Sequence, residues 1–353
     1  MKSYITRRRF MGNITKMGTA AAVSPSLYKL NNSSKEIIKP RKLKKGDTIG
    51  IITPGSGITD LQMLREGIEN LQSLGFRVKL GDHVKERYGY LAGNDDQRLY
   101  DLHAMFADPD IDGIITLRGG YGTMRLLNSI DYSIIRRNPK VLLGYSDITA
   151  LTLGIHAMTG LVTFHGPVAI STFTEYTQKY FEKTLMTNTA TGPIDHPDPG
   201  ETLHPTAHFN TLHGGTGYGP LIGGNLTLMT ALLGTPFECD TKGKIVFIEE
   251  IGEEPYSIDR MLTQLLLSNK LQQSAGIVID SCKKCGVSDY KPSFSSSFGV
   301  EEVFVERLKH LNIPIVFGFS IGHIADKPTL PLGINATLDA DKRTLSIDES
   351  AVS

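Results

Sequence analysis

The residues best suited to do chemistry begin with a serine placed directly after a short apolar run. Val141 to Leu143 is typical of a strand and runs into Gly144-Tyr-Ser146-Asp-Ile-Thr149. A hydroxyl placed there stands at the carboxyl end of the strand, where the free amides of the next helix can stabilise an oxyanion. The sequence does not contain the G-x-S-x-G motif of a nucleophile elbow. The similarity to such an elbow is therefore in the placement of the serine, not in the motif. The alternative is that Ser146 or Asp147 caps the helix.

A carboxylate and a histidine follow two other apolar runs. Glu249 and Glu250 come directly after Ile245 to Ile248, and His323 follows Ile315 to Phe317 with a glycine beside it. A serine hydroxyl is a weak nucleophile unless a base takes its proton, and that base needs a carboxylate to fix its tautomer. Ser146, Glu249 and His323 would supply these three roles. The alternative is that His323 is a structural histidine.

A glycine loop, Arg118-Gly-Gly-Tyr-Gly122, follows another apolar run at Gly113 to Leu117. Glycine lets backbone amides approach a ligand closely, as an oxyanion requires. The loop has neither the G-x-G-x-x-G spacing nor the lysine of a nucleotide-binding loop. The alternative is a tight turn between a strand and a helix.

The elements that must position these residues alternate between strand and helix. The strands are expected at 48–53, 77–80, 113–117, 141–143 and 162–164, and the helices at 61–74, 123–130 and 147–158. This alternation predicts an α/β fold with a wound parallel sheet, in which ligands gather at the carboxyl ends of the strands.

The rhythm is lost over residues 171–217, which are rich in proline and glycine and are interpreted as a linker with some helix at 177–187. Beyond it, strands are expected at 245–248, 277–279 and 315–316, helices at 258–268 and 300–310, and a hairpin over 335–347. The sequence therefore predicts an N-terminal α/β domain over 36–170 that carries the nucleophile. A smaller, mixed C-terminal domain over 218–353 carries the glutamate and histidine.

Composition bounds the function classes. The chain has 353 residues and no net charge, but seven of its 37 basic residues lie in residues 1–35, which contain no acid. The remaining residues carry more acidic than basic groups, so no basic footprint for nucleic acid is expected. No apolar run is long enough to predict a membrane span.

The three cysteines cannot build a disulfide framework. Cys282-Lys-Lys-Cys285 could form a short disulfide, half of a zinc site or a redox pair, or be structural. A zinc site needs a second pair of ligands of this kind, and the sequence has none, so no metal site is predicted.

Residues 1–35 are typical of a targeting segment. Arg7-Arg-Arg-Phe10 is followed by the weakly apolar stretch Met17 to Val23, a pattern that resembles a twin-arginine export signal. The expected location is therefore outside the cytoplasm, in the periplasm, with a cytoplasmic location as the alternative.

Together, the ordered motifs resemble the LD-carboxypeptidase (muramoyltetrapeptide carboxypeptidase) family of serine peptidases. The resemblance covers nearly everything after residue 40. Its motifs are the ones already described together with Gly46-Asp-Thr-Ile-Gly50, Pro139-Lys140, Phe164-His-Gly-Pro167, Gly223-Gly-Asn-Leu226 and Leu330-Pro-Leu-Gly333.

The resemblance implies a Ser-Glu-His triad of Ser146, Glu249 and His323 with no cofactor and no metal. It implies an oxyanion hole made by the amide of Asp147 and one from the glycine loop, at Gly122 or Gly120. It also implies a C-terminal domain with a barrel-like sheet, a homodimer, and release of the terminal D-alanine from a murein tetrapeptide. Arg118 is the expected partner of the substrate carboxylate.

Two other functions are compatible with this resemblance. A related immunity branch hydrolyses peptidyl nucleotide antibiotics and tends to carry an aromatic residue, often tryptophan, that stacks on the base, whereas this chain has no tryptophan. The other function is that of a catalytically inactive protein that binds murein peptides, against which the presence of all three triad residues argues.

Overall fold

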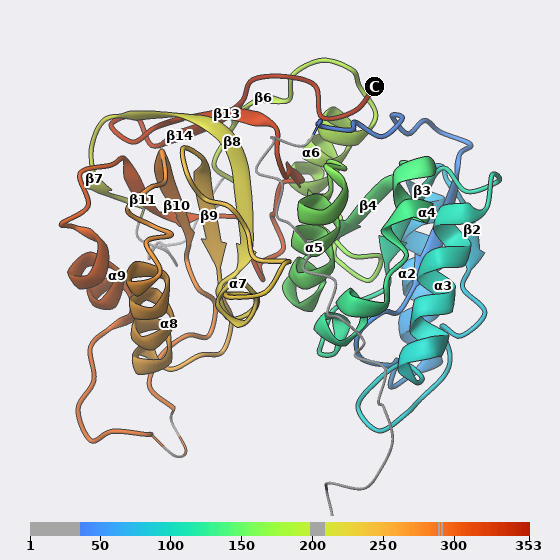
Figure 1. Cartoon of the computed structure of the whole chain (residues 1–353), viewed down its shortest axis with the longest axis horizontal. Coiled ribbons are helices and arrows are strands. Elements are labelled where there is room, and N and C mark those ends of the chain that lie inside the picture. The colour runs from blue at the N-terminus through green and yellow to red at the C-terminus, as the bar shows by residue number, and fades with distance from the viewer. Residues whose placement is uncertain (1–35, 198–208, 289, 291) are drawn as a thin grey trace, which may run out of the picture. The chain divides into compact units, whose positions relative to one another are not determined.

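The computed structural model describes residues 36–197, 209–288, 290 and 292–353. The expected export signal, residues 1–35, lies outside the described residues. Residues 36–353 form one compact unit. Within it, the strands are arranged in two sheets (Figure 1).

The first sheet has six strands in the order β12-β5-β4-β3-β1-β2. Its strands are parallel except for the antiparallel pair of β5 and β12. Strands β3 and β4 are buried along their whole length, as expected of the centre of a sheet covered on both faces. The bounds are β1 Thr48–Ile52, β2 Arg77–Leu80, β3 Gly113–Thr116, β4 Val141–Gly144, β5 Phe164–His165 and β12 Leu330–Pro331.

The chain order of these strands creates a switch point. From β1 the chain runs to β2 on one side and then crosses to β3 on the other. Ligands bind outside the carboxyl ends of the strands at such a point, because the loops there diverge. The loops after β1 and β3, residues 53–57 and 117–122, therefore mark the expected ligand site at the edge of the first sheet. This edge lies next to the turn that carries Ser146.

Three of the helices of this part, α2, α3 and α4, begin with a side-chain cap. Asp60 accepts a hydrogen bond from Gln62 N at the start of α2, and Asn94 forms a capping box with Gln97 at the start of α3. The 123–130 segment, expected to be an α-helix, is the 3-10 helix η2, whose bounds are Thr123–Ser129. The others are α2 Leu61–Ser73, α3 Asp95–Ala107, α4 Tyr132–Arg137, η3 Ser146–Ile148 and α5 Thr149–Thr159.

Residues 171–217 contain more regular structure than a linker would. Helix α6 spans Glu175–Leu185, and the segment supplies both edge strands of the second sheet, β6 (Gly192–Ile194) and β7 (Asn210–His213). Conversely, β12 brings residues from near the C-terminus into the first sheet. The domain division drawn from the sequence stays a prediction.

The second sheet has eight strands in the order β6-β14-β13-β8-β9-β10-β11-β7. Its central strands β8 to β11 run parallel, and the outer pairs are antiparallel. No pairing among the described residues joins the edge strands β6 and β7, so the sheet is mixed but is not a closed barrel. The strands are β8 Thr216–Asn225, β9 Ile245–Glu249, β10 Gly276–Asp280, β11 Ile315–Phe319, β13 Asn335–Asp339 and β14 Thr344–Ile347, and the helices are α7 Leu226–Ala231, α8 Pro255–Leu267 and α9 Val300–Leu308.

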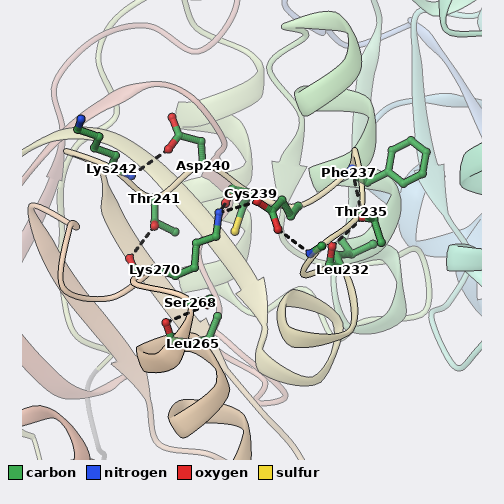
Figure 2. A network of polar contacts seen from close by, with 12 residues as sticks. Leu232, Thr235, Phe237, Cys239, Asp240, Thr241, Lys242, Leu265, Ser268 and Lys270 are labelled. Carbon is green, nitrogen blue, oxygen red and sulfur yellow. Dashed lines mark hydrogen bonds and ion pairs between the residues drawn. The ribbon is translucent and has the colours of Figure 1, made fainter. Parts of the chain in front are cut away.

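A polar network fastens the segment that leads into β9 (Figure 2). Lys270 Nζ donates to Glu238 Oε1 at 2.9 Å and to the carbonyl of Cys239 at 3.2 Å. In return, Thr241 Oγ1 donates to the carbonyl of Lys270 at 2.6 Å. The segment before β9 is thereby fastened to the residues around Lys270, and Glu249 lies at the other end of β9.

Helix α5 connects the two sheets. It packs against β4 and β8, and it lies between the two sheets in Figure 1. Its first residue contacts the second sheet directly, because Asn225 N donates to Thr149 Oγ1 at 3.1 Å. One continuous buried core includes residues of both sheets. The turn at Ser146 is therefore fixed relative to the strand ends that carry Glu249 and Asp280.

Candidate active site

Ser146 occupies a strained turn between β4 and α5. Its φ angle is 65°, in the left-handed region that residues with a Cβ rarely adopt. The turn is tight because Gly144 has no side chain: a Cβ there would lie 2.5 Å from Thr116 Oγ1 and 2.8 Å from Ile148. Backbone strain of this kind is concentrated at functional sites.

The helix-capping alternative for Ser146 and Asp147 is wrong. Neither η3 nor α5 has a side-chain cap at its start. The buried Asp147 carboxylate instead accepts hydrogen bonds from Gly122 N at 3.3 Å and Thr123 N at 3.1 Å. The side chain of Asp147 thus fixes the glycine loop against the serine turn, and the pKa of this carboxyl is raised by burial.

Glu249 and His323 form a hydrogen-bonded pair. His323 Nδ1 lies 2.8 Å from Glu249 Oε2, and the Glu249 side chain is fully buried. When Nδ1 carries the proton, Nε2 has the free lone pair that a general base needs. The structure therefore brings together two residues that are 74 positions apart in the sequence.

This pair lies against the serine turn. The rings of Tyr145 and His323 have centroids 4.8 Å apart, and Tyr145 immediately precedes Ser146. His165 packs between Tyr145 and Phe247, with ring centroids at 6.1 and 5.0 Å, and its Nε2 lies 2.7 Å from the carbonyl oxygen of Ile321. No hydrogen bond joins Ser146 Oγ to His323 within the described residues, and catalytic hydrogen bonds of this kind often tighten only in the complex with substrate.

The oxyanion hole predicted from the glycine loop is only partly compatible with the geometry. Gly122 N is directed at Asp147 Oδ1, so this amide is not available for an oxyanion. Gly120 N makes no hydrogen bond within the described residues. A Cβ on Gly119 would lie 3.1 Å from Ser146 Cβ and 3.3 Å from Asp147 N. The Gly119–Gly120 peptide therefore adjoins the Asp147 amide, and Gly120 is the loop residue that fits the role.

Arg118 lies half-buried at the end of β3, and its Nη1 donates to the carbonyl of Gly57 at 3.3 Å. The sequence reasoning missed a second arginine, Arg98, whose side chain is buried. Arg98 donates to the carbonyls of Pro54 and Gly122 and so joins the two loops of the switch point. No signal identified it, since an arginine inside an amphipathic helix is usually solvated.

Two buried ionisable residues beside the pair were also missed. Asp280 ends β10 next to Glu249 and is fully buried. Burial, together with the negative charge of Glu249, raises the pKa of Asp280 to about 7. Lys327 is buried near Tyr145. Asp280 could have been found from its position, because it ends an apolar strand as Glu249 does.

Several other predictions can be compared with the structure. Cys239, Cys282 and Cys285 are free thiols, so the short disulfide is not formed here. The described residues contain no group of three or more His, Cys, Asp or Glu side chains placed to hold a metal ion. Among the helices of the described ranges, none is both long and apolar enough to span a membrane.

Known proteins share this architecture over most of their length. A probable murein peptide carboxypeptidase of Bacillus subtilis (strain 168) is 41% identical over 319 residues, which is 88% of this chain and 94% of that protein. The microcin C7 self-immunity protein MccF of Escherichia coli is 31% identical over 338 residues, which is 88% of this chain and 96% of that protein. The crystal structure of a muramoyltetrapeptide carboxypeptidase from Oxalobacter formigenes has a TM-score of 0.72 and 30% identity, covering 86% of this chain and 99% of that one.

Two family matches cover successive parts of the chain. Residues 49–166, which contain nearly all of β1 to β5 together with Ser146, match the LD-carboxypeptidase N-terminal domain. Residues 218–338, which contain most of β8 to β13 together with Glu249 and His323, match the LD-carboxypeptidase C-terminal domain. The second match includes β12, which pairs with β5 in the first sheet. Since both domains match, in order and with the candidate residues inside them, the chain belongs to the LD-carboxypeptidase family of peptidases.

Proposed function

We propose that this protein is a serine carboxypeptidase that releases the terminal D-alanine from a murein tetrapeptide by cleaving the bond between an L-centre and the D-residue. The observation that supports this most directly is the 2.8 Å contact of His323 Nδ1 with Glu249 Oε2 beside the strained Ser146 turn. The similar protein of B. subtilis is named a probable murein peptide carboxypeptidase, and that of O. formigenes a muramoyltetrapeptide carboxypeptidase.

In the proposed mechanism, Ser146 Oγ attacks the carbonyl carbon of the scissile bond while His323 Nε2 takes its proton. Glu249 stabilises the imidazolium that forms and keeps the ring in position. The negative charge that develops on the carbonyl oxygen is stabilised by the amides of Asp147 and Gly120, which are held in place before substrate arrives. His323 then gives the proton to the departing amine, and an acyl-enzyme on Ser146 remains until water hydrolyses it.

The experiment that tests the proposal is incubation of purified protein with murein tetrapeptide, followed by mass spectrometry. Tripeptide and D-alanine are the expected products. Wild-type protein that leaves the tetrapeptide intact, or Ser146→Ala protein that still cleaves it, contradicts the proposed function.

A second candidate is hydrolysis of peptidyl nucleotide antibiotics, favoured by the similarity to MccF. The absence of tryptophan from this chain argues against it, because stacking on a base is the chemistry such a substrate would require. Release of product from an aminoacyl nucleotide, but not from tetrapeptide, would select this candidate. Binding of tetrapeptide without turnover would select an inactive binding protein.

We also propose that the enzyme is exported by the twin-arginine route and acts on murein outside the cytoplasm. The support is Arg7 to Phe10, together with the absence of acids from residues 1–35. Cell fractionation of wild type and of the Arg7→Lys, Arg8→Lys double variant tests this. Wild-type protein confined to the cytoplasm with its first residues intact would refute export and would leave the peptidase proposal unaffected. A homodimer, common in the family, is a further expectation that size-exclusion chromatography with light scattering can test.

A further inference from the structure

Lys327 is a buried lysine with an unusual environment. It lies four residues after His323, in the segment between β11 and β12, and only 3% of it is exposed. Lysine is almost never fully buried unless its charge is paired. Within the described residues, however, Lys327 Nζ makes neither a hydrogen bond nor an ion pair. Its contact is with the face of the Tyr145 ring, whose centroid is 5.1 Å from Nζ.

The backbone of Lys327 is held firmly. Lys327 N donates to Thr177 Oγ1 at 3.1 Å, and Thr177 Oγ1 donates to the carbonyl of Ala325 at 2.9 Å. Thr174 Oγ1 donates to Asp326 Oδ1 at 2.5 Å. Helix α6 thus fixes this segment, so the side chain extends toward Tyr145 from a rigid base.

The ammonium group has no partner within the described residues, and 3% of the surface of Lys327 is exposed. Burial lowers the pKa of Lys327 to about 8, and the charge of Glu249 opposes that shift. The group is therefore still mainly a cation at neutral pH.

The position of Lys327 relative to the triad indicates which part of a substrate would contact its ammonium group. His323 must donate a proton to the nitrogen of the departing residue, and the carboxylate of that residue is two bonds from the nitrogen. His323 and Lys327 both pack on the ring of Tyr145, at 4.8 Å and 5.1 Å. A departing residue whose nitrogen faces His323 can thus direct its carboxylate to Lys327.

We propose that Lys327 is a specificity-determining residue that binds the terminal carboxylate of the departing D-residue. This inference rests on the proposed carboxypeptidase function. It is an alternative to the expectation for Arg118, one N–H group of which donates to the carbonyl of Gly57. It explains why a cation is buried beside the serine turn without a partner, because the substrate supplies the partner.

The test compares two forms of the same tetrapeptide, one with a free terminal carboxylate and one with a terminal carboxamide. Wild type should prefer the carboxylate. Lys327→Met should lose about 10- to 100-fold in kcat/KM on the carboxylate form, the range for a hydrogen bond to a charged group, and much less on the amide. Lys327→Arg should restore part of the preference. Lys283→Met removes a nearby exposed charge and is the matched control, which should keep the wild-type preference.

Other outcomes overturn the proposal. If Lys327 only tunes the electrostatics of Glu249, Lys327→Met loses equally on both substrates. If Arg118 binds the carboxylate, Arg118→Met abolishes the preference and Lys327→Met keeps it. Should Lys327→Met fail to fold, Lys327→Gln replaces it in the same comparison.

Failure of the proposed function gives a different result. Wild type would then cleave neither peptide. Calorimetric binding of the two peptides to Ser146→Ala protein, with and without Lys327→Met, tests the inference separately from turnover. Binding that does not distinguish carboxylate from carboxamide overturns the role of Lys327.

Discussion

Two neighbouring glutamates at the end of β9 should respond differently to replacement by glutamine. Glu249→Gln should lose activity and keep stability, whereas Glu250→Gln should lose stability and keep activity. Glu249 Oε2 contacts His323 Nδ1, and Glu249 Oε1 has no partner among the described residues. Glu250 accepts four hydrogen bonds, with Oε1 bound by Asn225 Nδ2 and Ile251 N and Oε2 by the amide and hydroxyl of Thr227. The glutamine variants of these two residues therefore form a matched pair.

In Glu249→Gln, the amide oxygen can still accept from His323 Nδ1, and the new NH₂ group takes the place of an oxygen that no donor contacts. The free energy of unfolding should change by less than about 1 kcal/mol. The imidazolium formed during catalysis loses its compensating charge, so kcat should fall by about 10²- to 10⁴-fold.

In Glu250→Gln, either orientation of the amide places an NH₂ group against donors that the carboxylate had accepted. An NH₂ group in place of Oε1 would face the donors Asn225 Nδ2 and Ile251 N, and one in place of Oε2 would face the amide of Thr227. In both orientations at least one donor is left without its acceptor. The free energy of unfolding should fall by about 1–3 kcal/mol. The start of α7 is affected most, because Thr227 belongs to its first turn. The folded enzyme should keep most of its turnover.

The assays are denaturant unfolding for stability and kcat on tetrapeptide for activity, with both variants measured side by side. Wild-type turnover in Glu249→Gln would refute the role of this carboxylate. A loss of stability in Glu249→Gln as large as that in Glu250→Gln would refute the assignment of the structural role to Glu250.

Three further predictions follow from the site. Ser146→Ala and Ser146→Gly should both be inactive. In denaturant unfolding, the glycine variant should be more stable than the alanine variant by about 1 kcal/mol, because glycine adopts the positive φ without strain. The raised pKa of Asp280, about 7 against a usual 3.8, means that the stability contributed by its neutral form is full below pH 4 and is lost as the pH rises through 7; Asp280→Asn should flatten that part of a melting-temperature profile, and an unchanged profile would contradict it. Because the triad needs no metal ion, a chelator should leave kcat on tetrapeptide unchanged, and inactivation that added metal reverses would contradict the serine mechanism.

The sequence was most informative where chemistry follows an apolar strand. Ser146 lies two residues after β4, Glu249 ends β9 and His323 follows β11, and these three strands are buried throughout and are mainly continuous apolar runs in the sequence. Strands β1 to β5, strands β9 to β11 and the terminal hairpin could be predicted from such runs, whereas β8 and β12 were not among the expected strands. The contact between Glu249 and His323 could not, because spacing in the sequence does not give the order of the strands in the second sheet, where only β10 lies between β9 and β11.

Residues that act through long-range contacts gave no signal. Arg98 joins two loops by donating to backbone carbonyls, and carbonyls are present at every position of a sequence. Strands β6 and β7 were hidden in the segment 171–217 because they are short edge strands that pair with distant partners. The engagement of Gly122 N by Asp147 depends on the exact course of two loops and could be seen only in the structure.

Three carboxylates meet at the carboxyl end of the second sheet, and their partners separate their roles. Glu250 is saturated by four donors and so acts as a structural acceptor. Asp280 accepts from the amides of Cys282 and Ile321, and burial beside Glu249 favours its neutral form. Glu249 alone among the three contacts the histidine. Because the pKa of Asp280 is raised to about 7, the negative charge beside Glu249 is reduced at and below neutral pH, which favours the ionised form of the carboxylate that the imidazolium requires.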